Sequence, residues 1–327
     1  MYRAKVIIST DVEGRVVMSR LPSRRQVVVG AAAAVAAAVL GPAAKSSAAP
    51  EAGSSEECGG RYQGYREGDR DRPYARYMAD RTAPVPAVVA NAYAGPALTS
   101  DLLPGFGSIA NDLGSTGYSS IETGYGQLAD GVVFVAVRTV MPRVTAEMWD
   151  WWFGWHSTEA ARYKLWHPDA HLHAALAEDR TALDIPDRAK YIGNTTFVDE
   201  YVGPKLQQLM IGFRDPVLHG FDVPADQTVI LGRVGSVIAP VDLGWLAHQI
   251  RPCDDGAEMR SRFYLNLRGL HVPDLKQATC AVRRGASVDP ADLVVGLDLA
   301  RDLMLHCGQE MNHLAGFLPE LYAEFSS

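Results

Sequence analysis

His306-Cys307-Gly308-Gln309-Glu310, close to the C-terminus, is the stretch around which the chain is organised. It lies in a long segment, Asp292 to about Phe325, whose leucines and valines recur at helical spacing. Residues four positions apart on a helix lie one above the other, so His306 and Glu310 project side by side. An imidazole nitrogen and a carboxylate oxygen at this spacing can share one divalent metal ion, and we expect zinc. The alternative is a hydrogen-bonded His–Glu pair on a solvated face.

The composition is that of an ordinary globular protein, with 327 residues, 47% of them hydrophobic and 21% charged. This length allows one or two domains with a sizeable core. The net charge of −7, without a basic stripe that contains aromatic residues, argues against a nucleic-acid partner. The sequence contains no internal repeat.

Residues 1–49 have the parts of a bacterial twin-arginine (Tat) export signal. Arg24-Arg25 is followed by an alanine-rich apolar run from Val27 to about Leu40, and small residues precede Pro50. The run is short and alanine-rich for a membrane span, and a short N-terminal anchor helix is the alternative. We therefore expect a secreted protein, extracellular or periplasmic, that has no membrane contact once the signal is removed.

Met18 stands just ahead of the two arginines, where such signals begin, so we expect the true start at Met18. The Tat route carries folded proteins, often with a cofactor inserted, and delivers them to an oxidising compartment. Disulfides are therefore expected, and Cys253–Cys280 is the preferred pair, although spacing alone does not determine connectivity. Cys307 follows a candidate ligand directly but points about 100° away on a helix, which indicates core packing.

The remaining chain divides into three parts by composition. Residues 50–74 are rich in Gly, Ser, Glu and Arg, which is typical of a flexible linker. Residues 75–115 alternate short helical pieces with Pro and Gly breaks, which predicts a small, mostly helical N-terminal lobe. We expect residues 116–327 to form the catalytic domain.

Strand patterns dominate this domain, interrupted by a tryptophan-rich helix. Residues 132–137 read as a strand whose hairpin partner lies in 118–128. Thr145 caps a helix through Phe153 whose tryptophans cover nearly its whole circumference, and a second helix covers 158–166. Further strands are expected at Tyr191–Tyr201, Leu206–Phe213, Thr228–Val234, Leu243–Arg251 and Arg260–Leu267.

Strands in series with short turns imply an antiparallel sheet. A long helix after such a sheet suggests a helix held in a curved sheet, with a ligand cavity between the two. The sequence therefore predicts an α+β protein, a helix-grip (START-like) domain with the small N-terminal lobe. Phe317-Leu318-Pro319-Glu320 is expected to kink the last helix or to start a short further one.

A metal site needs more than two ligands, and two upstream residues are candidates. His171 follows the break at Pro168, in an expected turn where its ring is free to point inward. Glu200 lies on an expected strand between inward-facing Val198 and Val202, where a buried carboxylate is costly unless a cation neutralises it. Two imidazoles and two carboxylates would neutralise a dication and suit zinc, with room for water or substrate.

Three other histidines compete with His171 for the third position. His156 lies on the tryptophan helix, where a core histidine bonded to a neighbour is the simpler interpretation. His167 precedes a proline and can cap the end of its helix. We expect His173 to be exposed.

Four short motifs follow one another in order along the chain. They are Trp151-Trp152-Phe153-Gly154-Trp155-His156, Arg162-Tyr163-Lys164-Leu165-Trp166-His167-Pro168-Asp169-Ala170-His171, Glu200-Tyr201-Val202-Gly203, and His306-x-x-x-Glu310 with Phe317-Leu318-Pro319-Glu320-Leu321-Tyr322. Together they resemble the family of 2,4-diacetylphloroglucinol hydrolase and phloretin hydrolase, over roughly residues 124–322. The occurrence of all four motifs in this order is far more specific than any one of them alone.

The resemblance implies a zinc enzyme that cleaves the carbon–carbon bond between an aryl ring and an acyl carbonyl. It also implies a helix-grip domain with a smaller helical N-terminal part. The zinc ligands of the family are two histidines and two glutamates, which match His171, Glu200, His306 and Glu310.

The family further uses pocket tyrosines and a histidine near the phenolic oxygens of the substrate. Tyr163 matches one tyrosine, and His248 and Tyr264, on neighbouring expected strands, match the others. On their strands, Tyr264 could instead be half-buried packing and His248 an ordinary hydrogen-bonded residue. The chain departs from the family pattern at Ala174, where the phloroglucinol-cleaving member has an asparagine, and in the interval from His171 to Glu200. These departures bear on the substrate more than on the metal.

The expected reaction is a retro-Claisen hydrolysis of an acylphloroglucinol-like substrate or a β-diketone, with His248 as proton donor and Tyr163 and Tyr264 holding phenolate oxygens. The alternatives on the same scaffold are a cyclase or isomerase, and a small-molecule-binding protein without catalysis. The four ligands also suit iron, manganese or cobalt. The oligomeric state stays open, and a homodimer is one of the options.

Overall fold

The computed structural model describes residues 6–10, 16–20, 58–290 and 293–326. Two short strands near the N-terminus, β1 (Val6–Thr10) and β2 (Val16–Arg20), pair antiparallel with each other. The twin-arginine motif and the apolar run after it lie outside the described residues, so the export signal stays a prediction. Among the residues that are described, no helix has the length and apolar character needed to cross a membrane.

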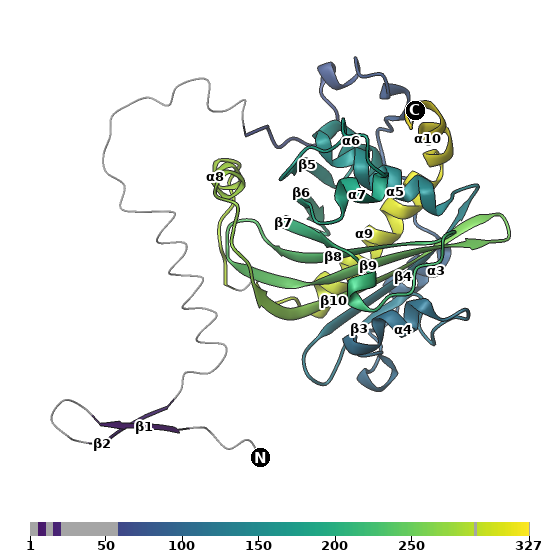
Figure 1. Ribbon diagram of the computed structural model, residues 1–327. Coiled ribbons are helices and arrows are strands. Elements are labelled where there is room, and N and C mark those ends of the chain that lie inside the picture. Colours follow the sequence, from purple (N-terminus) through teal and green to yellow (C-terminus); the bar gives the residue numbers. More distant parts are fainter. Residues whose placement is uncertain (1–5, 11–15, 21–57, 291–292, 327) are drawn as a thin grey trace, which may run out of the picture.

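One eight-stranded sheet organises the rest of the chain, with strand order β3-β4-β10-β9-β8-β7-β6-β5 (Figure 1). Every neighbouring pair in it is antiparallel. Its strands are β3 (Gly124–Gln127), β4 (Val133–Pro142), β5 (His171–Leu176), β6 (Thr195–Val202), β7 (Lys205–Arg214), β8 (Thr228–Ser236), β9 (Val241–Cys253) and β10 (Gly256–Leu270). The predicted α+β class with an antiparallel sheet is confirmed.

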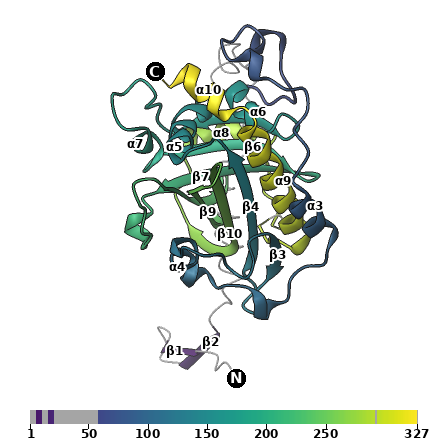
Figure 2. The ribbon, with the colours of Figure 1, turned by 90° about the vertical axis from the view of Figure 1, so that its right-hand side faces the viewer.

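Helices precede, interrupt and follow the strands. They are α3 (Ala87–Ala94), α4 (Ile109–Gly114), α5 (Ala146–Trp155), α6 (Ala160–Trp166), α7 (Asp187–Tyr191), α8 (Leu275–Arg283), α9 (Leu297–Ala315) and α10 (Leu318–Phe325). Figure 2 shows α9 running beside β4 and β3, with α5, α6 and α10 gathered at one end of the sheet. The break after α9 at Gly316 and the start of α10 agree with the expectation for the Pro319 region.

Both faces of the sheet are covered, because alternate residues of its strands enter two different apolar clusters. On β8, Ile230 and Val234 pack toward α5 and α9, whereas Val229 and Leu231 pack toward α4. Strands buried on both sides read as nearly continuous apolar runs. The face toward α5 and α9 is called the inner face below, and the other is the outer face.

The N-terminal segment packs on the sheet domain and not as a separate lobe. It is mostly helical, as expected, but α3 lies against α9, and α4 covers the outer face. The contact between α3 and α9 is close, since a Cβ added at Gly308 would lie 2.8 Å from Cγ1 of Val89. A residue larger than glycine would therefore push the two helices apart.

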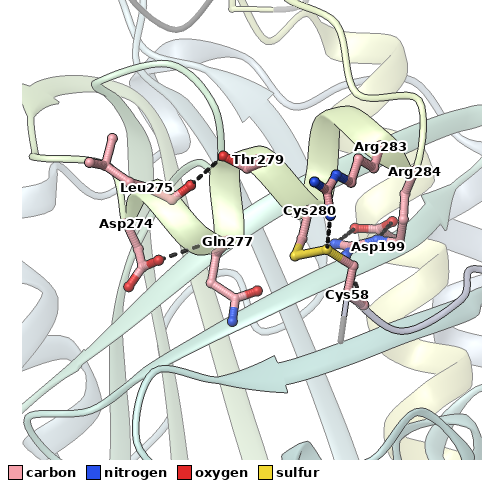
Figure 3. The surroundings of a disulfide bond; sticks show 9 residues. All are labelled: Cys58, Asp199, Asp274, Leu275, Gln277, Thr279, Cys280, Arg283 and Arg284. Atoms are coloured by element: carbon pink, nitrogen blue, oxygen red, sulfur yellow. Dashed lines mark hydrogen bonds and ion pairs between the residues drawn. A yellow bond between two sulfur atoms is a disulfide. The ribbon is translucent and has the colours of Figure 1, made fainter. Parts of the chain in front are cut away.

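The predicted disulfide is wrong, because Cys280 pairs with Cys58 and not with Cys253 (Figure 3). Cys253 ends β9, beside the turn into β10, and is a free cysteine. Cys58 and Cys280 are 222 residues apart in sequence, and nothing in their spacing indicates the fold that brings their Cα atoms to 5.0 Å. Cys307 is a free, fully buried core residue, as predicted.

Residues 58–74 also differ from the flexible linker expected there. Besides the disulfide, Lys164 Nζ donates hydrogen bonds to the carbonyl oxygens of Tyr62 and Gly64, both at 2.5 Å. The Tyr74 hydroxyl donates to Glu159 at 2.6 Å, and the Tyr74 side chain is buried. A stretch rich in Gly and Arg thus forms a strap that is fastened to α6 and α8.

Two fully buried arginines on the outer face of β10 depend on two carboxylates from the part of the chain that precedes β3. Arg260 and Arg262 contact Glu122 at 2.8 and 3.0 Å, and Asp112 lies 2.9 Å from Arg262. Burial opposes the charge on Glu122, but hydrogen bonds from Arg260 and the charge of Arg262 lower the pKa of Glu122 to about 2. Since this pKa lies below the ordinary glutamate value, ionised Glu122 stabilises the fold at neutral pH. That contribution is lost as the pH falls from about 4.5 toward 2.

Glu122→Gln should therefore lower the free energy of unfolding by roughly 3 kcal/mol at pH 7, because it leaves two buried guanidinium groups with Asp112 as their one remaining carboxylate. The difference from wild type should shrink at pH 3, as measured by denaturant unfolding at both pH values. Glu320→Gln is the control, because Glu320 pairs with Arg143 at the surface and such pairs contribute little. An equal loss at pH 7 and pH 3 would contradict the role assigned to Glu122.

Candidate metal centre

Strand pairing brings His171 and Glu200 together. His171 is the first residue of β5, and the backbone register places it opposite Glu200 on β6. The turn expected around His171 lies just before it, and a register shift follows between His171 and His173. Both His171 and Glu200 point to the inner face, where α9 carries the other two candidate ligands.

All four candidate ligands converge at this point. His171 Nε2 lies 3.6 Å from Glu200 Oε2 and 3.5 Å from Glu310 Oε2. His306 Nε2 lies 3.7 Å from the same Glu310 oxygen. Ligand atoms of His171, His306 and Glu310 all lie within 4.8 Å of one another, so these three side chains could hold a metal ion. Glu200 is the fourth group at the edge of this cluster.

The tautomer of His171 is determined by the backbone. Its Nδ1 is 2.9 Å from the carbonyl oxygen of Tyr163, and a carbonyl only accepts, so Nδ1 carries the hydrogen. The lone pair of Nε2 therefore faces the two carboxylates. This fully buried nitrogen has no hydrogen-bond partner among the described residues. A lone pair oriented in this way by a second bond is typical of a metal-binding histidine.

The electrostatics of the cluster are unfavourable without a cation. Burial, together with the neighbouring His306, lowers the pKa of His171 well below its usual value, so both imidazoles are neutral. Burial raises the pKa of Glu200 to about 7, opposed by the hydrogen bond from the Tyr163 hydroxyl. Burial and the charge of Glu200 raise the pKa of Glu310 well above its usual range. Neutral imidazoles and crowded carboxylates fit a divalent ion such as Zn²⁺.

The three rival histidines surround the cluster without joining it. His167 stacks on His306 at 4.7 Å, and its Nδ1 is hydrogen bonded to Thr82 Oγ1 at 2.8 Å. His156 is a buried histidine bonded to the backbone, as expected. His173 is buried and not exposed, because the strap that begins at Cys58 covers the outer face of β5.

A cavity on the inner face adjoins the cluster. Its lining includes Glu200, His306 and Glu310 as well as two of the three proposed catalytic residues, Tyr163 and His248. Tyr163 stacks on His171 at 3.8 Å and donates its hydroxyl to Glu200. The remaining lining is mostly apolar: Phe153, Trp166, Val198, Ile211, Phe213, Leu246, Phe263 and Leu303, with His156, Ser157 and Thr196 as polar members.

His248 is held on the cavity wall by β10. Its Nδ1 lies 2.8 Å from Ser261 Oγ, its cross-strand neighbour, and its ring contacts Phe263 edge-on. Burial lowers the pKa of His248 to about 3, which keeps the ring neutral at physiological pH. A neutral ring with one nitrogen bound to a hydroxyl leaves the other nitrogen for a ligand.

The structure does not bring Tyr264 into the cavity. Tyr264 lies one position from Phe263, and alternation along β10 turns its ring to the outer face against Phe106 and Phe134. Its hydroxyl is buried and has no hydrogen-bond partner among the described residues. Ser261 and Phe263 were not predicted from the sequence. Pairing of the two neighbouring strands at His248, together with the alternation of side chains between the two faces, could have indicated them.

The region that carries these residues is similar to a known protein family. A family model described as the DAPG hydrolase PhiG domain matches residues 103–323. This chain belongs to the DAPG hydrolase family. The resemblance of the four motifs is thereby confirmed, over a region that contains every candidate site residue.

Curated relatives cover most of the chain. A 2,4-diacetylphloroglucinol hydrolase of Pseudomonas protegens is 30% identical over 276 residues, 79% of this chain and 86% of the relative. A phloretin hydrolase of Eubacterium ramulus is 29% identical over 269 residues, 80% of this chain and 93% of the relative. The names of these relatives give 2,4-diacetylphloroglucinol and phloretin as their substrates. The solved structure of Ara h 8.0201 overlays with a TM-score of only 0.34 and 9% identity, covering 58% of this chain and 99% of that one.

Substitution of single ligands tests the centre. His171→Ala and His306→Ala should each strongly reduce the zinc bound to purified protein, measured by elemental analysis, because each removes a buried lone pair directed at the ion. His173→Ala is the matched control, since His173 lies on the same strand but faces the strap. Retention of wild-type zinc by both ligand variants would exclude this centre.

Proposed function

We propose that this protein is a zinc-dependent hydrolase that cleaves the bond between an aromatic ring carbon and an acyl carbonyl in acylphloroglucinol-like phenols. The observation that carries the proposal is the convergence of His171, Glu200, His306 and Glu310 at a buried cavity that His248 also lines. Membership of the DAPG hydrolase family, whose relatives are named for such substrates, supports it.

The reaction breaks the ring-carbon–acyl-carbon bond, adds the hydroxyl of water to the acyl carbon and returns a hydrogen to the ring carbon. In the keto tautomer of the phenol, neighbouring carbonyls stabilise the negative charge left on the ring. A divalent ion held by the four ligands would supply Lewis acidity for the acyl oxygen and lower the pKa of water. The products are a carboxylic acid and the deacylated phenol.

His248 is the proton donor in this scheme. When Nδ1–H donates to Ser261 Oγ, Nε2 of the neutral ring has a lone pair that can accept a proton from the attacking water. The ring can then pass this proton to the departing ring carbon and is neutral again at the end. The aromatic and aliphatic lining around it excludes water and restricts the orientation of a flat ring. Tyr163 positions Glu200 through its hydroxyl and His171 through its carbonyl and ring, so it acts on the ligands and not on the phenolate expected from the sequence.

One experiment separates this function from the cyclase, isomerase or binding-protein alternatives. Purified protein is analysed for metal and incubated with a panel of acylphloroglucinols, and released carboxylic acid is detected by mass. Stoichiometric zinc with release of acid supports the hydrolase. Tight binding of the same phenols without acid release, at full metal content, would overturn it.

We also propose that the scaffold is a helix-grip domain. The support is the packing of α9 along β3 and β4 on the inner face, with the cavity between α9 and the other strands. Export through the Tat route is a further proposal, supported by Arg24-Arg25 and by the disulfide between Cys58 and Cys280, which suits an oxidising compartment.

His248→Ala should lower kcat by about 10²–10⁴-fold with a smaller change in KM, because it removes the proton donor but leaves the ligands. Steady-state kinetics on the best acylphloroglucinol of the panel measures this. Tyr264→Phe is the control, since its hydroxyl lies on the outer face. A variant at Tyr264 that lost as much activity as the His248 variant would contradict the placement of the site.

Replacing Arg24 and Arg25 together by lysine should retain the protein in the cytoplasm of a Tat-competent bacterial host. Cell fractionation measures its location, and thiol labelling should then find Cys58 and Cys280 reduced. The unchanged chain expressed in parallel is the control. Export of the double variant at the wild-type level would exclude the twin-arginine route.

A further inference from the structure

A second polar group, separate from the candidate ligands, lies in the wall of the same cavity. It consists of His156 and Ser157, which follow α5, and Thr196, near the start of β6. All three side chains are almost fully buried, with 3%, 1% and 3% of their surfaces exposed. Polar side chains in an apolar wall are costly unless they are hydrogen bonded, so their partners show what they can bind.

The directions of these hydrogen bonds follow from one backbone carbonyl. His156 Nδ1 lies 2.7 Å from the carbonyl oxygen of Trp152, which only accepts, so Nδ1 carries the hydrogen and Nε2 has a lone pair. Ser157 Oγ, 3.0 Å from Nε2, must then donate to it. Thr196 Oγ1 in turn donates to Ser157 Oγ at 3.4 Å. Burial lowers the pKa of His156 to about 4, so the ring is neutral at physiological pH.

This chain of donors leaves Thr196 as an acceptor toward the cavity. Its hydrogen is used by Ser157, and no donor to its oxygen is present in the described part of the chain. A ligand atom there must therefore bring its own hydrogen, as a phenol or alcohol does. A carbonyl or an ether oxygen would meet only lone pairs.

The aromatic surroundings hold the chain of bonds rigid. The His156 ring stacks on Trp152 at 4.8 Å and meets Trp166 and Phe153 edge-on at 5.3 Å. A ring packed in this way has little freedom to turn, so the acceptor direction of Thr196 is preorganised.

The site lies at a distance from the reacting end of the cavity. Thr196 and Glu200 share the inner face of β6 four residues apart, which separates their Cα atoms by roughly 13 Å. A hydroxyl next to the acyl group of a substrate is too close to the carbonyl to reach Thr196 while that carbonyl lies at the ligands. The hydroxyl that binds here must be remote from the cleaved bond.

We propose that His156, Ser157 and Thr196 form a subsite that accepts a hydrogen bond from a remote aromatic hydroxyl of the substrate, and so selects hydroxylated aryl ketones. The proposal rests on the proposed function for the position of the reacting carbonyl. The hydroxyl can come from the acylated ring, opposite the acyl group, or from a second ring at the end of the acyl arm.

Three probes distinguish the two sources. The first is an acylphloroglucinol with a hydroxyphenylpropanoyl arm, the second lacks the hydroxyl on the arm, and the third lacks the ring hydroxyl opposite the acyl group. Thr196→Val keeps the shape of the side chain and removes the acceptor. It should lower kcat/KM about five- to tenfold for probes that carry the recognised hydroxyl and leave the probe without it nearly unchanged. Ser157→Ala should act in the same direction.

Thr139→Val is the matched control, because Thr139 is an equally buried threonine outside the cavity lining. An equal effect of Thr196→Val on all three probes, or no effect on any, would overturn the subsite. If the wild type cleaves none of the probes, the proposed function fails. The subsite is then tested by calorimetry, which measures the affinity of wild type and Thr196→Val for the same probes. Weaker binding of only the hydroxyl-bearing probes to Thr196→Val would support it, and unchanged or uniformly weakened binding would overturn it.

Discussion

The burial of two carboxylates beside two neutral imidazoles is the constraint on which the rest of the structure depends. Glu200 and Glu310 approach the same nitrogen of His171 in a cavity that offers them little water. Like charges in an apolar environment are strongly unfavourable, so this arrangement needs either protons or a cation. Strand pairing brings Glu200 next to His171, and one turn of α9 places Glu310 next to His306.

The two faces of the sheet carry side chains of different kinds. The inner face carries the candidate ligands His171 and Glu200 together with His248, whereas the outer face carries buried ion pairs and Tyr264. Alternation along a strand assigns each side chain to a face, so neighbours such as Phe263 and Tyr264 have unrelated surroundings. Strands of this sheet thus hold His171, Glu200 and His248 in position without loops.

Much of this could be predicted from the sequence. The α+β class, the antiparallel strands and the pairing of His306 with Glu310 follow from periodicity, which is local information. His171 and Glu200 could be proposed because a buried glutamate between valines needs a counter-charge. Assigning Tyr264 to the site failed because a family match to a tyrosine does not tell which face of β10 it occupies. The predicted Cys253–Cys280 disulfide was wrong, because the actual pairing of Cys58 with Cys280 depends on a contact across 222 residues.

The close packing of α3 on α9 at Gly308 determines how much of the N-terminal part a shortened chain has to keep. Val85 and Val89 press on the helix turn that lies between His306 and Glu310. The family match starts only at residue 103, after α3 has ended. A chain trimmed to the matched region would leave the back of this turn open to solvent, and the spacing of two candidate ligands would lose its support. A fragment that keeps the back of this turn covered therefore has to include α3.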